Sequence, residues 1–210
     1  MTTVASEQMT DHLCSLVALL REERGHDYKQ SASWNQLKYK IAKTCIGMAN
    51  TRYGGVIIIG VKQEADDIFT PTGMSEVEAQ TYSEDDIRTF VNTYADPSLN
   101  LNLVRFKCDE QLFLAIEVPE FTDIPVICSR DGRDLTAGTV YIRPMGKAET
   151  RPPRDAYELR ELLNLSTQKS TRRFIEEMRA VGVLAPTSLD PAPTDSDRFD
   201  QQLGSLLEKD

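Results

Sequence analysis

The spacing of hydrophobic residues changes several times along the chain, and each spacing predicts a different element. Apolar side chains recur at helical intervals over residues 6–24, and Gly25 supplies a helix stop. A second amphipathic helix is expected over residues 34–50, with Ser33 as its N-cap. Residues 56–61, VIIIGV, follow a Gly-Gly turn and are apolar throughout, which is typical of a strand covered on both faces.

The rest of the chain alternates between strand and helix patterns. Residues 101–107 and 112–118 flank a polar turn and predict an antiparallel hairpin, and residues 139–143, TVYIR, predict a further strand. Additional helices are expected over residues 83–94, 154–165 and 167–181. Together these elements predict an α/β (α+β) fold, a single domain whose mixed sheet is flanked by helices, mainly on one side.

The domain is expected to cover residues 26–182, after an N-terminal helix in residues 1–25 and before an acidic, flexible tail in residues 183–210. Of the 210 residues 40% are hydrophobic, which is enough to bury a core. No run approaches the roughly 18 apolar residues that a membrane span needs, and the N-terminus lacks the pattern of a secretory signal. We therefore expect a soluble protein with no membrane partner.

Cysteine usage points to the compartment. The four cysteines are far apart in sequence and form no CxxC pair. They are Cys14, Cys45, Cys108 and Cys128. We expect buried free thiols in a reducing, cytoplasmic environment rather than a zinc site.

Charge is segregated along the chain. A net charge of −9 at pH 7 argues against bulk affinity for nucleic acid, but local distribution can override the total. Residues 28–62 contain no Asp or Glu, and a phosphate-facing surface is expected from the basic side chains of this segment and those around the last strand. These candidates are Lys29, Lys38, Lys40, Lys43, Arg52, Lys62, Arg143 and Lys147. The alternative is a solvated helix face with no ligand.

The motifs DYKQS, ANTRYGGVIIIGV and TVYIR follow one another in an order that resembles the Schlafen/AlbA-type (Schlafen AlbA_2) family, from about Glu22 to Leu165. The resemblance implies a domain that binds nucleic acid, RNA or DNA. Because relatives are often built as paired copies that form a basic groove, it also implies a homodimer for a chain with one copy.

The same resemblance implies an alternative function, because some members are similar to endonucleases that cleave structured RNA with a metal-bound carboxylate trio. Glu22, Asp27 and Glu64 would be the catalytic carboxylates and would bind Mg²⁺ or Mn²⁺, and Lys29 would neutralise the scissile phosphate. The chain departs from the family pattern in having Asp27 where a glutamate is usual, and Lys62 where an acid usually follows the strand. The structural alternative is that these acids are solvated.

Two further interpretations stay open. Residues 50–55 form a glycine-containing turn that could approach a phosphate, but the turn follows a helix C-terminus, where the dipole repels anions, so a structural role is expected. A regulatory protein–protein interaction module is the remaining alternative, in which the acidic tail and the acidic segment 64–100 would contact a basic protein partner.

Overall fold

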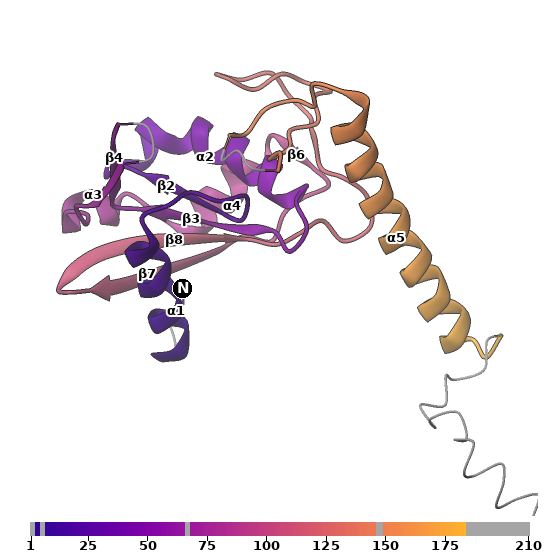
Figure 1. Cartoon of the computed structure of the whole chain (residues 1–210), viewed down its shortest axis with the longest axis horizontal. Helices are drawn as coiled ribbons and strands as arrows, with labels where there is room; N and C mark the ends of the chain where they lie inside the picture. The colour runs from indigo at the N-terminus through magenta and orange to yellow at the C-terminus, as the bar shows by residue number, and fades with distance from the viewer. Residues whose placement is uncertain (1–2, 5–6, 66–67, 146–148, 184–210) are drawn as a thin grey trace, which may run out of the picture. The chain divides into compact units, whose positions relative to one another are not determined.

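The main sheet of the described residues is mixed and five-stranded, with strand order β1-β7-β8-β3-β2 (Figure 1). The computed structural model describes residues 3–4, 7–65, 68–145 and 149–183. The strands are β1 (Thr3–Val4), β2 (His26–Lys29), β3 (Gly55–Ile59), β7 (Asn102–Cys108) and β8 (Gln111–Val118). β2 pairs parallel with β3 and β1 parallel with β7, whereas β8 pairs antiparallel with both of its neighbours. The predicted α/β class and the predicted hairpin are confirmed.

The described residues also form helices and two small ribbons. The helices are α1 (Glu7–Leu19), α2 (Trp34–Ala49), α3 (Glu76–Gln80), α4 (Glu84–Asn92) and α5 (Ala156–Ala180). The ribbons are β4 (Val61–Ala65) with β5 (Ile68–Pro71), and β6 (Ala95–Asp96) with β9 (Ile127–Cys128). The N-terminus of α2 is closed by Gln36, whose carboxamide accepts from the backbone N–H of Ser33 at 3.1 Å.

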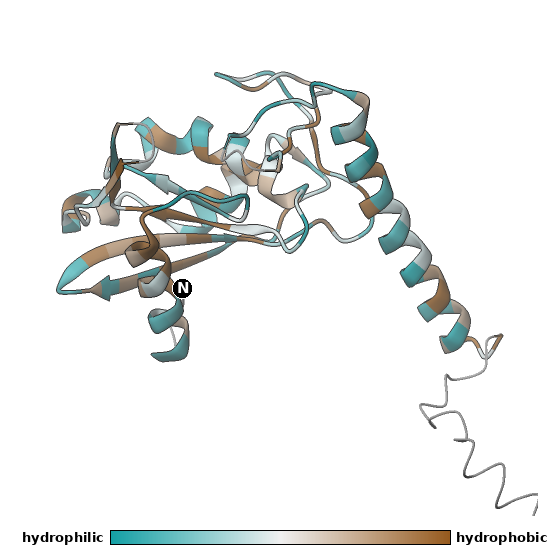
Figure 2. Cartoon of the chain, viewed as in Figure 1, coloured by the Kyte–Doolittle hydropathy of each residue, from teal (hydrophilic) through white to brown (hydrophobic). Residues whose placement is uncertain are grey.

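Apolar side chains of β3 alternate between two cores, as a strand covered on both faces requires. Ile57 and Ile59 pack with α2 and α4 in one cluster, whereas Ile58 packs with Leu13 and Val17 of α1 in the other. Accordingly, α1 and α2 lie on opposite sides of the sheet, and the central strands are mainly hydrophobic in colour (Figures 1 and 2). The apolar residues of β3 therefore contribute to the core on each face of the sheet.

The observed elements differ from the predicted ones at three places. The expected strand over residues 56–61 ends early because Gly60 has a φ of +117° and turns the chain into β4. Residues 139–143 form isolated bridges, Ile127 with Val140 and Ile142 with Arg151, instead of a strand. The two helices expected after residue 153 are one continuous helix, α5, because neither Gly nor Pro interrupts it.

The chain divides into two compact units, Met1–Ser170 and Thr171–Asp210, and α5 runs from the first into the second. In the second unit, α5 carries Arg172–Glu176 and Arg173–Glu177 ion pairs at helical i,i+4 spacing. The acidic tail is predicted for residues 183–210. Of these only Val183 is described, so the rest of the predicted tail lies outside the described residues. Among the helices of the described part, none is both long and apolar enough to span a membrane.

A disulfide joins Cys14 of α1 to Cys108 at the end of β7, with Cα atoms 5.7 Å apart. The expectation of four free thiols is therefore wrong for this pair, and correct for Cys45 and Cys128, which are free and buried. The two bonded residues are 94 positions apart, so spacing could not reveal their contact. The contact between the two cysteines depends on the packing of α1 against β7.

Candidate nucleic-acid interface

Three lysines of the predicted surface lie on α2, between Lys38 and Lys43. Lys40 is exposed, whereas Lys38 and Lys43 are half-buried over aromatic rings. Nζ of Lys38 lies 5.2 Å from the ring centroid of Phe90, and Nζ of Lys43 lies 5.3 Å from that of Tyr141. Such cation–π contacts leave the ammonium groups at the surface while their stems are packed.

From Thr44 to its end at Ala49, α2 is buried and offers no surface to a ligand. A Cβ on Gly47 would lie 2.5 Å from a methyl carbon of Thr150, so the loop passes directly over the helix. Asn50 is buried and donates to the carbonyls of Val126 and Tyr141 at 2.8 and 2.9 Å. The asparagine of the motif therefore holds the backbone at Val126 and at Tyr141 next to the end of the helix.

The prediction that Arg143 contacts phosphate is wrong, because its side chain is 0% exposed and cannot reach a phosphate. Its guanidinium donates to Oδ1 of Asp27 at 2.9 Å and to the carbonyls of Glu23, Arg24 and His26 at 2.9 to 3.1 Å. The arginine of TVYIR thus holds the start of β2 in place. Lys147, the next predicted basic residue, lies outside the described residues.

The predicted acids beside β2 lie together in a buried charge network. Asp27 is 4% exposed and is paired with both Arg143 and Lys29. Glu22 accepts a hydrogen bond from the backbone N–H of Tyr28 at 2.8 Å. Burial raises the pKa of the Glu22 carboxyl, and the charge of Asp27 raises it further.

The raised pKa of Glu22 gives a testable pH dependence. A carboxyl whose native pKa is raised holds its proton more tightly in the folded state, so its ionisation destabilises the fold as the pH rises through that pKa. We expect Glu22→Gln to melt at a higher temperature than the wild type at neutral pH, because the amide oxygen can still accept from Tyr28. This difference in melting temperature should disappear as the pH falls below 4.5, the ordinary pKa of a glutamate. Thermal melts over a pH series check this, with the exposed Glu23→Gln as control; a gain that persists in acid would contradict it.

The third predicted carboxylate does not join this network. Glu64 is exposed on β4, and its Oε1 lies 3.5 Å from Nζ of Lys62, so this lysine is also paired with an acid. Within the described residues, which include all three carboxylates, no group of three or more His, Cys, Asp or Glu side chains could hold a metal ion. Asp27 is moreover already neutralised by two cations. The arrangement does not fit Mg²⁺ or Mn²⁺, and no cleavage step follows from it.

The turn after α2 is built around two consecutive left-handed residues, Tyr53 with a φ of +71° and Gly54 with a φ of +69°. A Cβ on Gly54 would lie 2.1 Å from the carbonyl oxygen of Val118, so only glycine fits there. The N–H of Tyr53 donates to Oε2 of Glu120 at 2.9 Å, and its ring is 88% exposed. The predicted structural role of the glycines agrees with this geometry.

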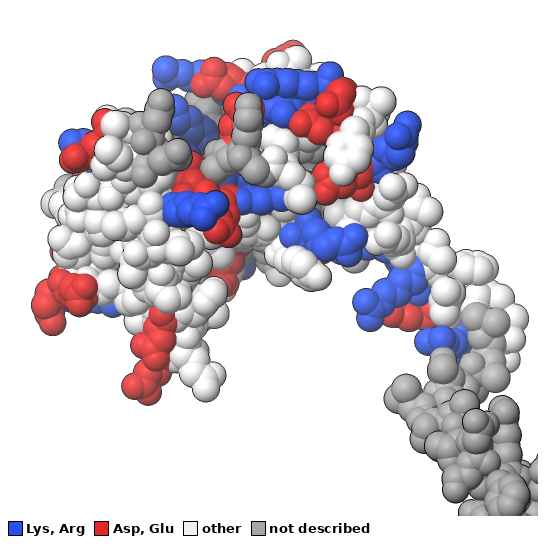
Figure 3. Space-filling model, in the orientation of Figure 1, with Lys and Arg blue, Asp and Glu red and all other residues white. Residues whose placement is uncertain are grey.

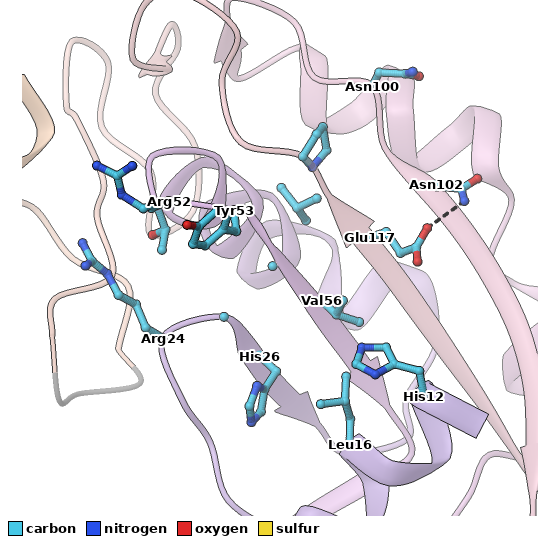
Figure 4. A pocket seen from close by; sticks show the side chains of 16 residues that line it. His12, Leu16, Arg24, His26, Arg52, Tyr53, Val56, Asn100, Asn102 and Glu117 are labelled. Carbon is cyan, nitrogen blue, oxygen red and sulfur yellow. Dashed lines mark hydrogen bonds between the residues drawn. The ribbon is translucent and has the colours of Figure 1, made fainter. Parts of the chain in front are cut away.

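A cavity of about 660 Å³ opens beside this turn, where β2 and β3 begin and β8 ends (Figure 4). Arg24 and Arg52 lie at one end of the cavity and Asn100, Asn102 and Glu117 at the other, with the ring of Tyr53 between them (Figure 4). Both histidines of the chain, His12 and His26, also line it.

Of the residues at the two ends of the cavity, sequence reasoning named only Arg52. The others come from distant segments that meet at one edge of the sheet, and nothing local marks them. Basic and acidic side chains are interleaved on the upper part of the visible face, whereas the visible ends of α1 and of the β7–β8 hairpin are acidic (Figure 3). No single-sign surface of large extent is seen from this side.

A family model described as Schlafen, AlbA_2 matches residues 22–150, more than half of the chain. The chain belongs to the Schlafen AlbA_2 family. The matched segment of this family member begins at Glu22, so α1 precedes it and α5 follows it. No curated protein matches the sequence.

Two solved structures are similar to this Schlafen AlbA_2 domain at 18% identity over 70% of the chain. The DIP2311 protein of Corynebacterium diphtheriae has a TM-score of 0.45, and the match spans 27% of its chain. The N-terminal domain of a Nitrosomonas europaea protein, described as related to the ATP-dependent DNA helicase RecG, has a TM-score of 0.46 and is covered to 95%.

Proposed function

We propose that this Schlafen AlbA_2 domain binds nucleic acid, RNA or DNA, through phosphate contacts made by α2 and the turn that follows it. The observation that supports this most is the exposure of Lys40 and Arg52 on a segment without a carboxylate, in a chain whose net charge is −9. Lys38 and Lys43 extend the surface, since their ammonium groups lie over aromatic rings.

Such contacts position a phosphate backbone without reading its sequence. Each phosphate that is neutralised releases counterions, so the logarithm of the affinity falls with the logarithm of the salt concentration by about 0.9 per contact on duplex DNA and about 0.7 on single strands. Binding should therefore be steep in salt and tolerant of sequence.

The test is a charge reversal on the proposed surface. We expect Lys40→Glu with Arg52→Glu to weaken binding of labelled RNA and DNA at least about tenfold and to flatten the salt dependence. Fluorescence anisotropy over a salt series measures both quantities. The matched control is Lys107→Glu with Arg179→Glu, which changes the charge equally at exposed positions outside α2. Equal losses in both variants, or no binding by the wild type at low salt, would reject the proposal.

The proposal contains no cleavage, because Glu64 stands apart from Glu22 and Asp27, as described above. A homodimer with two copies of the basic surface stays a prediction. Light scattering on the eluting peak of a size-exclusion column, with and without nucleic acid, measures the number of chains directly.

A further inference from the structure

We infer that the cavity beside the Tyr53 turn is a pocket for one unpaired nucleobase, so that the preferred ligand is a single strand. This inference rests on the proposed function, because phosphate contacts on Arg52 and α2 would bring the strand to the cavity. Its own basis is the shape and chemistry of the cavity itself.

The size of the cavity suits a nucleotide. At about 660 Å³ it falls within the range of roughly 300–1,000 Å³ that small-molecule sites occupy. Leu16, Val56 and Pro119 give it apolar walls, and polar side chains lie at its two ends. A planar base needs this combination of flat apolar contact and a few placed donors and acceptors.

The polar end can bind a base edge. Nδ2 of Asn102 donates to Oε2 of Glu117 at 2.8 Å, which fixes both side chains, and the other carboxylate oxygen of Glu117 points into the cavity (Figure 4). Asn100 lines the same end. Amide and carboxylate groups are the side chains that pair with the amino groups and ring nitrogens of bases.

Tyr53 supplies a stacking surface beside the cavity. An exposed aromatic residue in the left-handed region is strained, and a glycine or an asparagine would occupy the position at lower cost. The ring packs against little of the protein, so the fold does not explain its presence. Base stacking on an aromatic ring does explain it, because every base has a π-face.

The basic end provides for the phosphate. The guanidinium of Arg24 is already engaged within the protein, since it forms an ion pair with Glu161 at 2.7 Å and donates to the carbonyl of Arg143. Arg52, in contrast, donates to the neutral amide of Gln168 at 2.9 Å. Its charge is therefore available to the phosphate that follows or precedes the bound base.

A pocket of this kind disfavours a paired base. A base inside a duplex is stacked and hydrogen-bonded, and extruding it breaks these interactions. A strand with unpaired bases presents them without this cost, so the pocket should favour single strands over duplex of the same sequence.

The experiment compares a short single-stranded oligonucleotide with an abasic backbone of equal length and charge. We expect the wild type to bind the intact strand about tenfold more tightly. Tyr53→Ala should remove this difference and Tyr53→Phe should keep it. The control Tyr157→Ala removes another exposed tyrosine, which is 71% exposed on α5, and should behave as the wild type.

The outcomes separate this inference from the proposed function. If neither strand binds at low salt, the proposed function fails. If both strands bind equally, the proposed function stands and the base pocket is overturned. A free mononucleotide that binds more tightly than the oligonucleotide would overturn the assignment to a strand.

A stability measurement tests whether the ring serves the fold. Tyr53→Gly removes both the ring and the backbone strain, so we expect it to melt at a higher temperature than the wild type while losing base discrimination as Tyr53→Ala does. A lower melting temperature would mean that the ring is structural, and would overturn the inference.

Discussion

Replacing Arg143 by methionine is expected to lower the free energy of unfolding by about 3–5 kcal/mol. The guanidinium is completely buried and donates to the carboxylate of Asp27 and to several backbone carbonyls at the start of β2. Methionine fills much of the same volume, so the loss comes from the carboxylate and the carbonyls that are left without donors. Urea denaturation followed by circular dichroism measures it.

Two controls define the origin of this loss. Arg154→Met removes an exposed guanidinium that pairs with Glu149 at 3.4 Å, and should change stability by less than about 1 kcal/mol. Arg143→Met combined with Asp27→Asn should be less destabilised than the sum of the two single variants, because the buried charge is gone. Strict additivity would show that Asp27 and Arg143 are not energetically coupled.

Removing the disulfide has the second large expected effect. Under oxidising conditions Cys14→Ser should lower stability by about 2–4 kcal/mol, because the bond closes a long loop and attaches α1 to β7. Leu13 and Val17 of this helix belong to the second core, so its detachment also exposes apolar surface.

Reductant provides the control for the disulfide. The wild type in reductant should unfold at the same urea concentration as Cys14→Ser does without it, and Cys14→Ser combined with Cys108→Ser should be no less stable than the single variant. A wild-type midpoint that ignores reductant would show that the bond contributes nothing in solution.

Local patterns predicted those parts of the fold that local physics determines. The apolar run at β3 required two covered faces, and Ser33 indicated where α2 begins. The strand expected over residues 139–143 failed because the segment has partners for single bridges only. Strand propensity does not determine whether a neighbouring strand is present to pair.

The site was less predictable because it depends on contacts between distant residues. A basic residue counted as surface charge in sequence, Arg143, is the most deeply buried side chain of the network. The cavity is lined by residues of α1, of the turn after α2, of the start of β7 and of the end of β8. Residue spacing within any one of these segments cannot predict that they meet. In the acid-free segment Lys40 and Arg52 are exposed, as is usual for long charged side chains, and their role in binding stays a prediction.

The turn that carries Arg52 and Tyr53 is attached to α5 at two adjacent positions. Gln168 accepts from Arg52, and Lys169 lies 3.4 Å from Glu120, the same carboxylate that anchors the N–H of Tyr53. Because Gln168 and Lys169 belong to one helix, a shift of that helix changes both attachments together. The guanidinium of Arg52 and, through Glu120, the backbone of Tyr53 are thus both attached to α5, so a displacement of this helix would disturb the two neighbouring residues at once.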